Sequence, residues 1–261
     1  MAIFRGYIAD VDAVVVWMAA LHVPFLAIGF SKYKPVANAL FVGYFLRFIT
    51  MLIDLYTRFP LPHSGGDTER FLATATVISD NLYLLGQGIY GGAYSKLLGM
   101  LFSLTGPHRV IGQYLNVILG VTNMILAYKI LRSAGVPIRI ARKCVWILAL
   151  FPHSLIFSSI LLRENLVILF LLLSFYNFTL WFGAKNGIRV LLSISFLLVA
   201  CAFHSGLIGF LPGYAFMYMF YSHKQKTFLF SPRSLLVFGV FVLLSLAVFT
   251  RYAHVSDFPH P

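Results

Sequence analysis

Long apolar runs separated by short polar connections dominate this chain. A helix of about 20 apolar residues can cross the roughly 30 Å of hydrocarbon in a bilayer. Backbone groups in hydrocarbon must be hydrogen-bonded within their own segment, and the runs lack the period-2 alternation of barrel strands, so we predict helices. The full-length candidate spans are 12–30, 36–56, 110–130, 143–162, 165–183 and 234–252.

The stretch 190–221 is apolar but too long for one ordinary crossing. It is interrupted at Phe203-His204-Ser205-Gly206, which predicts two short helices that meet at this break. The predicted fold is therefore an all-α, polytopic transmembrane bundle of about eight membrane helices. With no tandem repeat or linker, a single membrane domain over 1–261 is expected. The chain ends at Pro261 shortly after the last span and without a polar tail, as a piece of a longer protein would.

The region 57–109 has a different pattern, because prolines and glycines interrupt it repeatedly. Its best apolar piece, 93–105, has about 13 residues, a length more typical of an interfacial or re-entrant segment than of a crossing. We predict one long outer loop with amphipathic helices near 68–80 and 93–105. In a competing topology 93–105 is a true crossing and the N-terminus lies inside. The interrupting residues are Pro60, Pro62, Gly65, Gly66, Gly86, Gly88, Gly91 and Gly92.

Composition and charge refine this picture. Hydrophobic residues make up 60% of the chain and charged residues only 11%, with a mean hydropathy of +0.86, which excludes a sizeable water-soluble domain. The net charge of +12 does not indicate a nucleic-acid partner, because the basic residues lie in short clusters between apolar runs. This is the positive-inside pattern. The basic connections, predicted to be cytoplasmic, are 31–35, 129–143, 184–189 and 222–233.

On this topology every acidic residue falls on the opposite, outer face, which supports the span assignment. We therefore expect a multi-pass protein of a bacterial inner membrane, with membrane lipid as a partner. Cys144 and Cys201 each lie inside an apolar run, and their separation fits neither a disulfide framework nor a metal site. The acidic residues are Asp10, Asp12, Asp54, Asp67, Glu69, Asp80, Glu164 and Asp257.

Arg163 and Glu164 stand at the junction of two apolar runs. A charged side chain deep in a bilayer costs about 2.5–3.5 kcal/mol on insertion scales, so the pair needs an explanation. In one interpretation it forms a solvated turn, where Glu164 favours the positive end of the following helix. In the other, Arg163 faces a water-filled cavity and binds an anionic group such as a lipid phosphate, which guanidinium holds in bidentate fashion.

Two carboxylates, Asp67 and Glu69, follow the flexible Gly65-Gly66 turn at the start of the 68–80 helix. Asp67 suits the N-cap position of that helix. A carboxylate at the outer mouth of a membrane cavity can also act as a general base toward a hydroxyl nucleophile. The two interpretations are compatible.

His204 and Arg47 are polar residues in apolar surroundings. His204 occupies the break in 190–221, either as a packed, hydrogen-bonded residue or as a proton acceptor. Arg47 lies in the middle of the 36–56 span, seven residues before Asp54 and on the same helix face. The two form either a structural polar pair, joined by water or a third residue, or part of the lining of a substrate cavity.

The GxxxxGK[ST], GxGxxG, HExxH and CxxC motifs do not occur in a usable context. A nucleotide-driven pump, a dinucleotide enzyme or a zinc protease therefore has no support, and we predict no cofactor.

The order of these features resembles that of two families of enzymes that handle lipid-linked sugars. Residues 60–183 resemble the GT-C-type membrane glycosyltransferases, which take sugars from polyprenyl-phosphate carriers at the outer face. The stretch 162–208 is similar to EpsG-like exopolysaccharide and O-antigen polymerases. The resemblance rests on the outer loop that opens with Asp67, on Gly106-Pro107-His108-Arg109, 114–120, Tyr128-Lys129, Arg132, Gly135, Phe151-Pro152, Ser158, Leu162-Arg163-Glu164-Asn165 and Ala202-Phe203-His204-Ser205-Gly206-Leu207-Ile208.

The resemblance implies transfer of a sugar from a polyprenyl-phosphate-linked donor to a glycan or lipid acceptor in cell-surface polysaccharide synthesis. GT-C enzymes often carry an acidic pair in the first outer loop, whereas Asp67 and Glu69 are not adjacent. A transporter or flippase of lipid-linked sugars and a noncatalytic membrane subunit are the alternatives; such transporters usually show inverted repeats, and none is found. The implied catalytic residues are Asp67 and His204, and the implied substrate-binding residues are Arg163, Glu164, Arg47 and Glu69.

Overall fold

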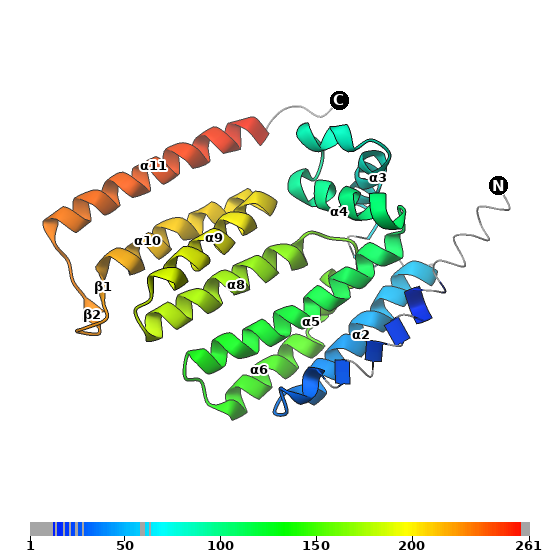
Figure 1. Cartoon of the computed structure of the whole chain (residues 1–261), viewed down its shortest axis with the longest axis horizontal. Coiled ribbons are helices and arrows are strands. Elements are labelled where there is room, and N and C mark those ends of the chain that lie inside the picture. Colours follow the sequence, from blue (N-terminus) through cyan, green and yellow to red (C-terminus); the bar gives the residue numbers. More distant parts are fainter. Residues whose placement is uncertain are drawn as a thin grey trace. The chain divides into compact units, whose positions relative to one another are not determined.

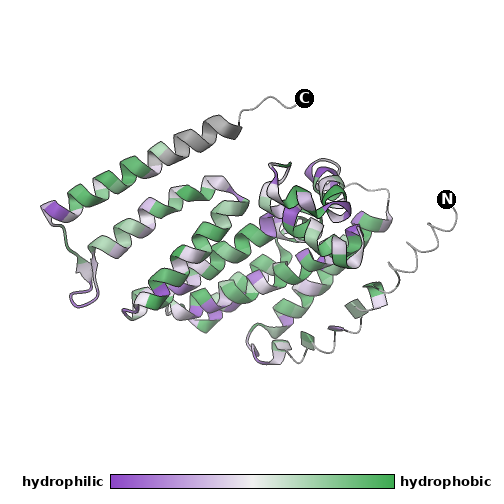
Figure 2. Cartoon of the chain, turned by 45° about the horizontal axis from the view of Figure 1, so that its top comes forward, coloured by the Kyte–Doolittle hydropathy of each residue, from purple (hydrophilic) through white to green (hydrophobic). Residues whose placement is uncertain are grey.

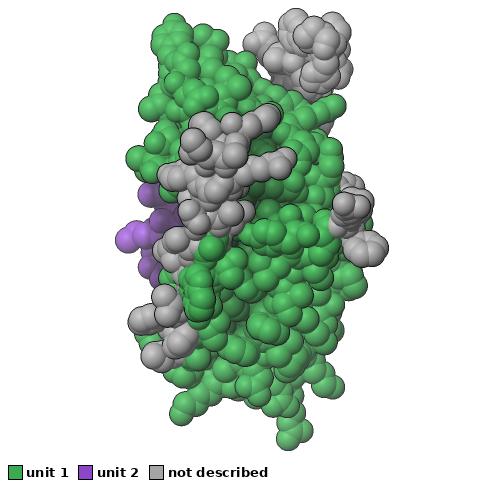
Figure 3. Space-filling model, turned by 90° about the vertical axis from the view of Figure 1, so that its right-hand side faces the viewer, with its two compact units in different colours: residues 1–169 green, residues 170–261 purple. Residues whose placement is uncertain are grey.

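The structure, a computed structural model, divides the chain into two compact units, residues 1–169 and 170–261 (Figure 3). For residues 246 and 248–256 only the backbone is described. The described residues are 13, 15–17, 19–20, 22–23, 26–27, 29–57, 61–62 and 64–256.

Helices make up most of the described chain (Figure 1). The first unit contains α2 (Ala37–Tyr56), α3 (Asp67–Asp80), the 3-10 helix η1 (Leu82–Gly86), α4 (Gly92–Thr105), α5 (Arg109–Ser133), α6 (Ile138–Leu150) and α7 (Pro152–Phe157). Helix α8 (Glu164–Gly183) crosses the boundary between the units. The second unit continues with α9 (Gly187–Phe203), the 3-10 helix η2 (Ser205–Gly209), α10 (Phe210–Phe220), β1 (Tyr221–Ser222), β2 (Thr227–Phe228) and α11 (Pro232–Ser256). The two short strands pair antiparallel, with Tyr221 opposite Phe228.

Three of the described helices, α2, α5 and α8, are long and apolar enough to cross a membrane. They correspond to the predicted spans 36–56, 110–130 and 165–183, which are confirmed as helices of spanning length. The apolar parts of α9, η2–α10 and α11 are shorter, so a helical membrane protein is supported but a total of eight spans is not. Figure 2 shows apolar residues along the helices and hydrophilic residues at several of the turns between them.

The predicted span 143–162 is wrong as a single helix. Helix α6 begins earlier, at Ile138, and ends at Leu150, and Pro152 then starts the short α7. Proline lacks the backbone N–H and its ring clashes with the carbonyl one turn before it, so α6 cannot continue through residue 152. At 13 residues α6 is about 20 Å long, less than the hydrocarbon thickness.

The break predicted in 190–221 is confirmed, because α9 ends at Phe203 and His204 precedes η2. Helix α9 begins at Gly187, inside the predicted connection 184–189. The Asn186 side chain accepts a hydrogen bond of 2.9 Å from the Ile188 N–H and so caps the helix. The predicted span 234–252 lies within α11. In the predicted span 12–30, residues 13, 15–17, 19–20, 22–23, 26–27 and 29–30 are described and are helical. The other residues of that span lie outside the described part of the chain, as do Asp10, Asp12 and Asp257.

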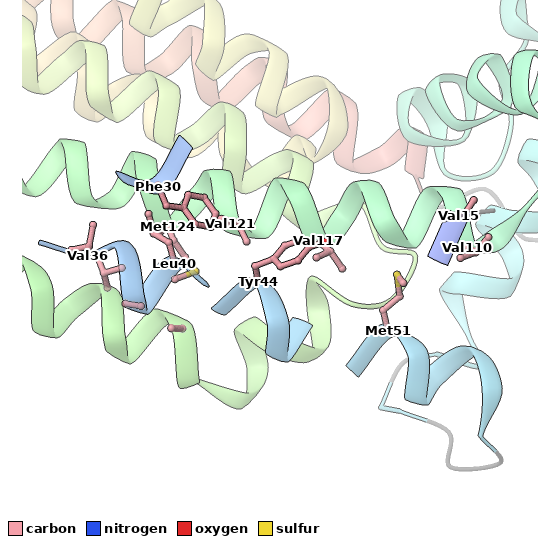
Figure 4. Close-up of a cluster of buried hydrophobic side chains, with 13 residues drawn as sticks. Val15, Phe30, Val36, Leu40, Tyr44, Met51, Val110, Val117, Val121 and Met124 are labelled. Carbon is pink, nitrogen blue, oxygen red and sulfur yellow. The ribbon is translucent and has the colours of Figure 1, made fainter. Parts of the chain in front are cut away.

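In the first unit, α2 and α5 pack side by side and run antiparallel. Asp54 contacts Arg109 at one end of the pair, and the ring of Tyr33 meets that of Tyr128 at the other. Apolar side chains of both helices fill the space between them, and α6 packs against both (Figure 4). The fully or nearly fully buried side chains here include Leu40, Tyr44, Met51, Val117, Val121 and Met124.

The region 57–109 contains the two predicted helices, α3 and α4, which pack against each other. Gly91 adopts a φ of +75° in the turn before α4, where a side chain would be strained and would also collide with Phe71. Helix α4 has 14 residues and is about 21 Å long, too short for an ordinary crossing. This length favours the topology in which 93–105 does not span.

The second unit is held together by aromatic rings and buried hydroxyl groups. The Ser174 hydroxyl donates to the Ser193 carbonyl over 2.6 Å and also contacts the Tyr214 hydroxyl, so α8, α9 and α10 meet at one point. Trp181 packs edge-on against Tyr218 with ring centres 4.5 Å apart. These contacts are specific because aromatic pairs prefer edge-to-face or offset geometry.

Candidate functional site

Residues 158–163 connect α7 to α8 without regular helix, inside a part of the chain that is almost fully buried. Carbonyl groups left unpaired in hydrocarbon cost several kcal/mol each. Asn116 of α5 removes this cost, because its side-chain amide donates to the Ile160 carbonyl at 2.7 Å and to the Leu162 carbonyl at 2.9 Å. Asn116 therefore fixes the segment that ends at Arg163.

Two more asparagines complete this attachment. The Asn165 amide donates to the carbonyls of Asn116 and Phe157, at 3.3 and 3.2 Å, and the Asn123 amide donates to the Asn165 carbonyl at 3.0 Å. Sequence reasoning missed the three asparagines, although buried amides inside apolar spans were a signal that some backbone there needs partners. They anchor the start of α8 to α5.

Arg163 and Glu164 stand at this anchored start of α8. Glu164 is the first residue of the helix, where the helix dipole stabilises a negative charge, as the solvated-turn interpretation predicts. The Arg163 Nε lies 3.9 Å from the Glu164 Oε1, beyond hydrogen-bond distance. The Arg163 Nε and the Glu164 Oε2 are buried atoms without a hydrogen-bond partner among the described residues. The two side chains as a whole are 33% and 39% exposed, so their outer atoms can meet a ligand.

Asp67 lies at the start of α3, which begins one residue earlier than predicted, so that Gly66 and not Asp67 is the cap residue. The exposed Asp67 carboxylate accepts a hydrogen bond of 2.7 Å from the Tyr90 hydroxyl. The Tyr90 ring packs against the Phe71 ring. The Arg163 guanidinium in turn lies 6.0 Å from the centre of the Phe71 ring. Asp67 and Arg163 are thus connected through two aromatic rings.

Two tyrosines in the site keep their protons at neutral pH. Burial raises the pKa of Tyr90, and Asp67 raises it further through its hydrogen bond and its charge. Burial also raises the pKa of Tyr94, on α4, and the negative charge of Glu164 adds to the effect. Both phenols therefore stay protonated, and that of Tyr90 donates to the Asp67 carboxylate. Neither tyrosine was singled out from the sequence.

An apolar cavity of about 320 Å³ adjoins this group. Leucines of α4 and α5 make up most of its wall, Leu166 of α8 contributes on one side, and Tyr94 and Asn116 are its polar lining. Cavities that hold small ligands typically measure about 300–1,000 Å³ and combine apolar walls with a few polar groups. The cavity can therefore take part of a hydrocarbon chain.

Glu69 belongs to a neighbouring cluster, built around Arg109 at the start of α5. Arg109 donates to Glu69 at 2.6 Å, to Asp54 at 2.7 Å and to the Ser64 hydroxyl at 2.8 Å. Gln113, one turn further along α5, also donates to Asp54 at 2.7 Å. Asp54 is therefore the partner of Arg109 and not of Arg47, and the predicted Arg47–Asp54 pair is wrong.

Arg47 lies in the interior of the first unit with its side chain fully buried. Its guanidinium donates to the Gly43 carbonyl at 2.9 Å, the Leu148 carbonyl at 3.0 Å and the Ser154 hydroxyl at 2.7 Å. These bonds join α2 to the end of α6 and to α7, where Pro152 interrupts the helical hydrogen bonding. They do not bring Arg47 to the Asp67–Arg163 group.

His204 lies in the second unit, at the cap position between α9 and η2, and is exposed. Its backbone N–H donates to the Ala200 carbonyl and its carbonyl accepts from Leu207, so the backbone of the break is hydrogen-bonded. Because the imidazole is exposed, it is free to act on a ligand. A packed imidazole would not be.

In the described part of the chain, no group of three or more His, Cys, Asp or Glu side chains is arranged to hold a metal ion. Comparisons with models of protein families, with curated proteins and with solved structures found no match to this chain.

Proposed function

We propose that this protein transfers a sugar from a polyprenyl-phosphate-linked donor to a glycan or lipid acceptor at the outer face of the membrane. The observation that carries the proposal is the connected group of Asp67, Tyr90, Phe71 and Arg163 beside an apolar cavity. It offers an accessible carboxylate, a partly exposed guanidinium group and a hydrocarbon-binding wall. A lipid-linked sugar phosphate requires these three elements.

The reaction is a displacement at the sugar carbon that carries the phosphate. Asp67 accepts the proton of the acceptor hydroxyl as its oxygen bonds to that carbon. The bond from the carbon to the phosphate oxygen breaks, and Arg163 stabilises the negative charge that develops on the leaving phosphate. A single displacement inverts the configuration of the carbon. Tyr90 positions Asp67 through its 2.7 Å hydrogen bond.

Glu164 is proposed as the group that orients a donor beside Arg163. His204, an exposed imidazole of the second unit, is proposed as a proton acceptor in its own right. Glu69 would act through Arg109, which holds the beginning of α3 in place. Each of these roles can be tested by a single substitution, His204→Gln, Glu164→Gln and Glu69→Gln.

The test is transfer of labelled sugar by the purified full chain from a panel of polyprenyl-phosphate sugars. Asp67→Asn should lower the rate by about 10²–10⁴, and Arg163→Gln by about 10²–10³. Asp80→Asn, which removes an exposed carboxylate at the other end of α3, is the matched control and should keep the wild-type rate. Full activity in both the Asp67→Asn and Arg163→Gln variants would refute the site assignment. Tight donor binding without transfer by the wild type would favour a carrier.

A further inference from the structure

A second polar site lies at the opposite end of α2 from Asp54, on the predicted cytoplasmic side. Two adjoining cavities, about 450 and 240 Å³ in volume, share the residues Pro35 and Arg142. Lys34, from the turn before α2, lines the larger cavity, and Arg139, from the first turn of α6, lines the smaller one. Three cationic side chains therefore surround one hollow.

These cations have no acidic partner. Residues 31–53 and 110–163 contain neither Asp nor Glu. The ion pairs in the described part of the chain belong to Arg109 and Arg163. Two cations nearby, Lys129 and Arg132, contact neutral groups, the Tyr33 ring and the Val136 carbonyl. The hollow thus carries a concentrated positive charge that no acidic side chain among the described residues neutralises.

The helix ends add to this charge. Helix α2 begins at Ala37 and α6 at Ile138, both at the hollow, and neither has a side-chain cap. The N-terminus of a helix carries partial positive charge and favours anions, so Arg139 and Arg142 in the first turns of α6 are unfavourable on their own. An anion bound between the two helix ends would satisfy both the free N–H groups and the cations.

We infer that this hollow binds the phosphate headgroup of an anionic membrane lipid. The site adjoins α2, a helix of spanning length, and therefore lies near the level of lipid headgroups. Trp146 and Ile138 form part of its wall, and Asn38 supplies a further hydrogen-bonding group. Tryptophan favours the membrane interface because its ring is apolar and its N–H is polar. Basic pockets between membrane helices on this side bind such headgroups.

The experiment titrates the purified full chain, in detergent, with phosphatidylglycerol or phosphatidylcholine and counts bound lipids by native mass spectrometry. We expect phosphatidylglycerol to bind more tightly than phosphatidylcholine. The triple variant Lys34→Gln, Arg139→Gln, Arg142→Gln should bind phosphatidylglycerol roughly a hundredfold more weakly, and Arg142→Gln alone about fivefold more weakly. The single variant keeps the test decisive if the triple variant does not fold.

The matched control removes three cations from the second unit, as Lys224→Gln, Lys226→Gln, Arg233→Gln, and should bind within about twofold of the wild type. Equal weakening in the two triple variants would mean that total charge and not this site attracts the lipid, and would overturn the inference. Unchanged binding in Arg142→Gln would also overturn it. Displacement of the lipid by an equal concentration of inorganic phosphate would assign the site to soluble anions instead.

Discussion

Arg109 and Asp54 form an ion pair of 2.7 Å that joins the first residue of α5 to the last turn of α2. The Asp54 side chain is only 1% exposed, and Gln113 donates a second hydrogen bond to the same carboxylate oxygen. This pair closes one end of the antiparallel helix pair, and Arg109 extends the connection to Glu69 on α3.

Arg109→Ala should lower the free energy of unfolding by about 3 kcal/mol, because it leaves the buried Asp54 carboxylate without its cation. The measurement is unfolding in mixed detergent micelles at increasing denaturing-detergent fraction. Arg132→Ala, at the other end of α5, is the control; its side chain is exposed and contacts only a carbonyl, so the loss should stay below about 1 kcal/mol. Equal losses in the two variants would contradict a special role for the Arg109–Asp54 pair.

The Tyr90 hydroxyl should stabilise the protein at neutral pH and lose this contribution at alkaline pH. Burial and Asp67 raise the pKa of Tyr90 above 10.0, so its contribution is fully present below the unfolded pKa and is lost as pH rises through the higher folded value. The difference in unfolding free energy between wild type and Tyr90→Phe should be constant from about pH 7 to 9 and shrink above about pH 10.

The control for this pH profile is Tyr83→Phe, on the same outer loop, where the side chain is 78% exposed. It gives the background contributed by an exposed phenol. If the two variants show the same change in unfolding free energy at every pH, the Tyr90–Asp67 hydrogen bond does not contribute to stability.

Gly120 lets α5 approach α2 and the segment after α7 closely. A Cβ at this position would lie 2.6 Å from the Ser158 Cβ and 2.9 Å from the Arg47 Nε. Gly120→Ala should therefore destabilise the protein by about 1–3 kcal/mol through overpacking. Gly213→Ala in α10, where a Cβ meets nothing within 4 Å, should be neutral or stabilising by up to about 1 kcal/mol. In thermal unfolding, Gly120→Ala should lower the stability and Gly213→Ala should leave it unchanged or raise it. A loss of stability in Gly213→Ala as large as in Gly120→Ala would refute the packing explanation.

The predicted topology places Asp67 outside and the β1–β2 turn inside. In a variant that lacks Cys144 and Cys201, a cysteine at position 67 should react with an impermeant maleimide added to intact cells. A cysteine at position 226 should react only after the membrane is permeabilised. The reverse pattern would invert the orientation and move the site to the cytoplasmic side.

The helices of this protein follow from local sequence properties. The spans α2, α5 and α8, the two helices of the outer loop and the break at His204 were all predicted from apolar length and from glycine and proline. These features are local because hydropathy and helix termination act within a few turns. The ends of α6 were predicted wrongly because the predicted span followed the length of the apolar run. That criterion gave no weight to Pro152, which ends the helix.

The partners of the charged residues were decided by the tertiary structure. Helix spacing suggested Arg47 for Asp54, but the partner is Arg109, 55 residues away along the chain. Asn116 and Tyr90 acquire their roles only when α5 lies against the segment before α8 and the loop folds back on α3. Sequence alone located the charged residues between the apolar runs and placed Arg47 within one of them. Only folding decided their partners, because an ion pair such as Arg109–Asp54 joins residues that are far apart along the chain.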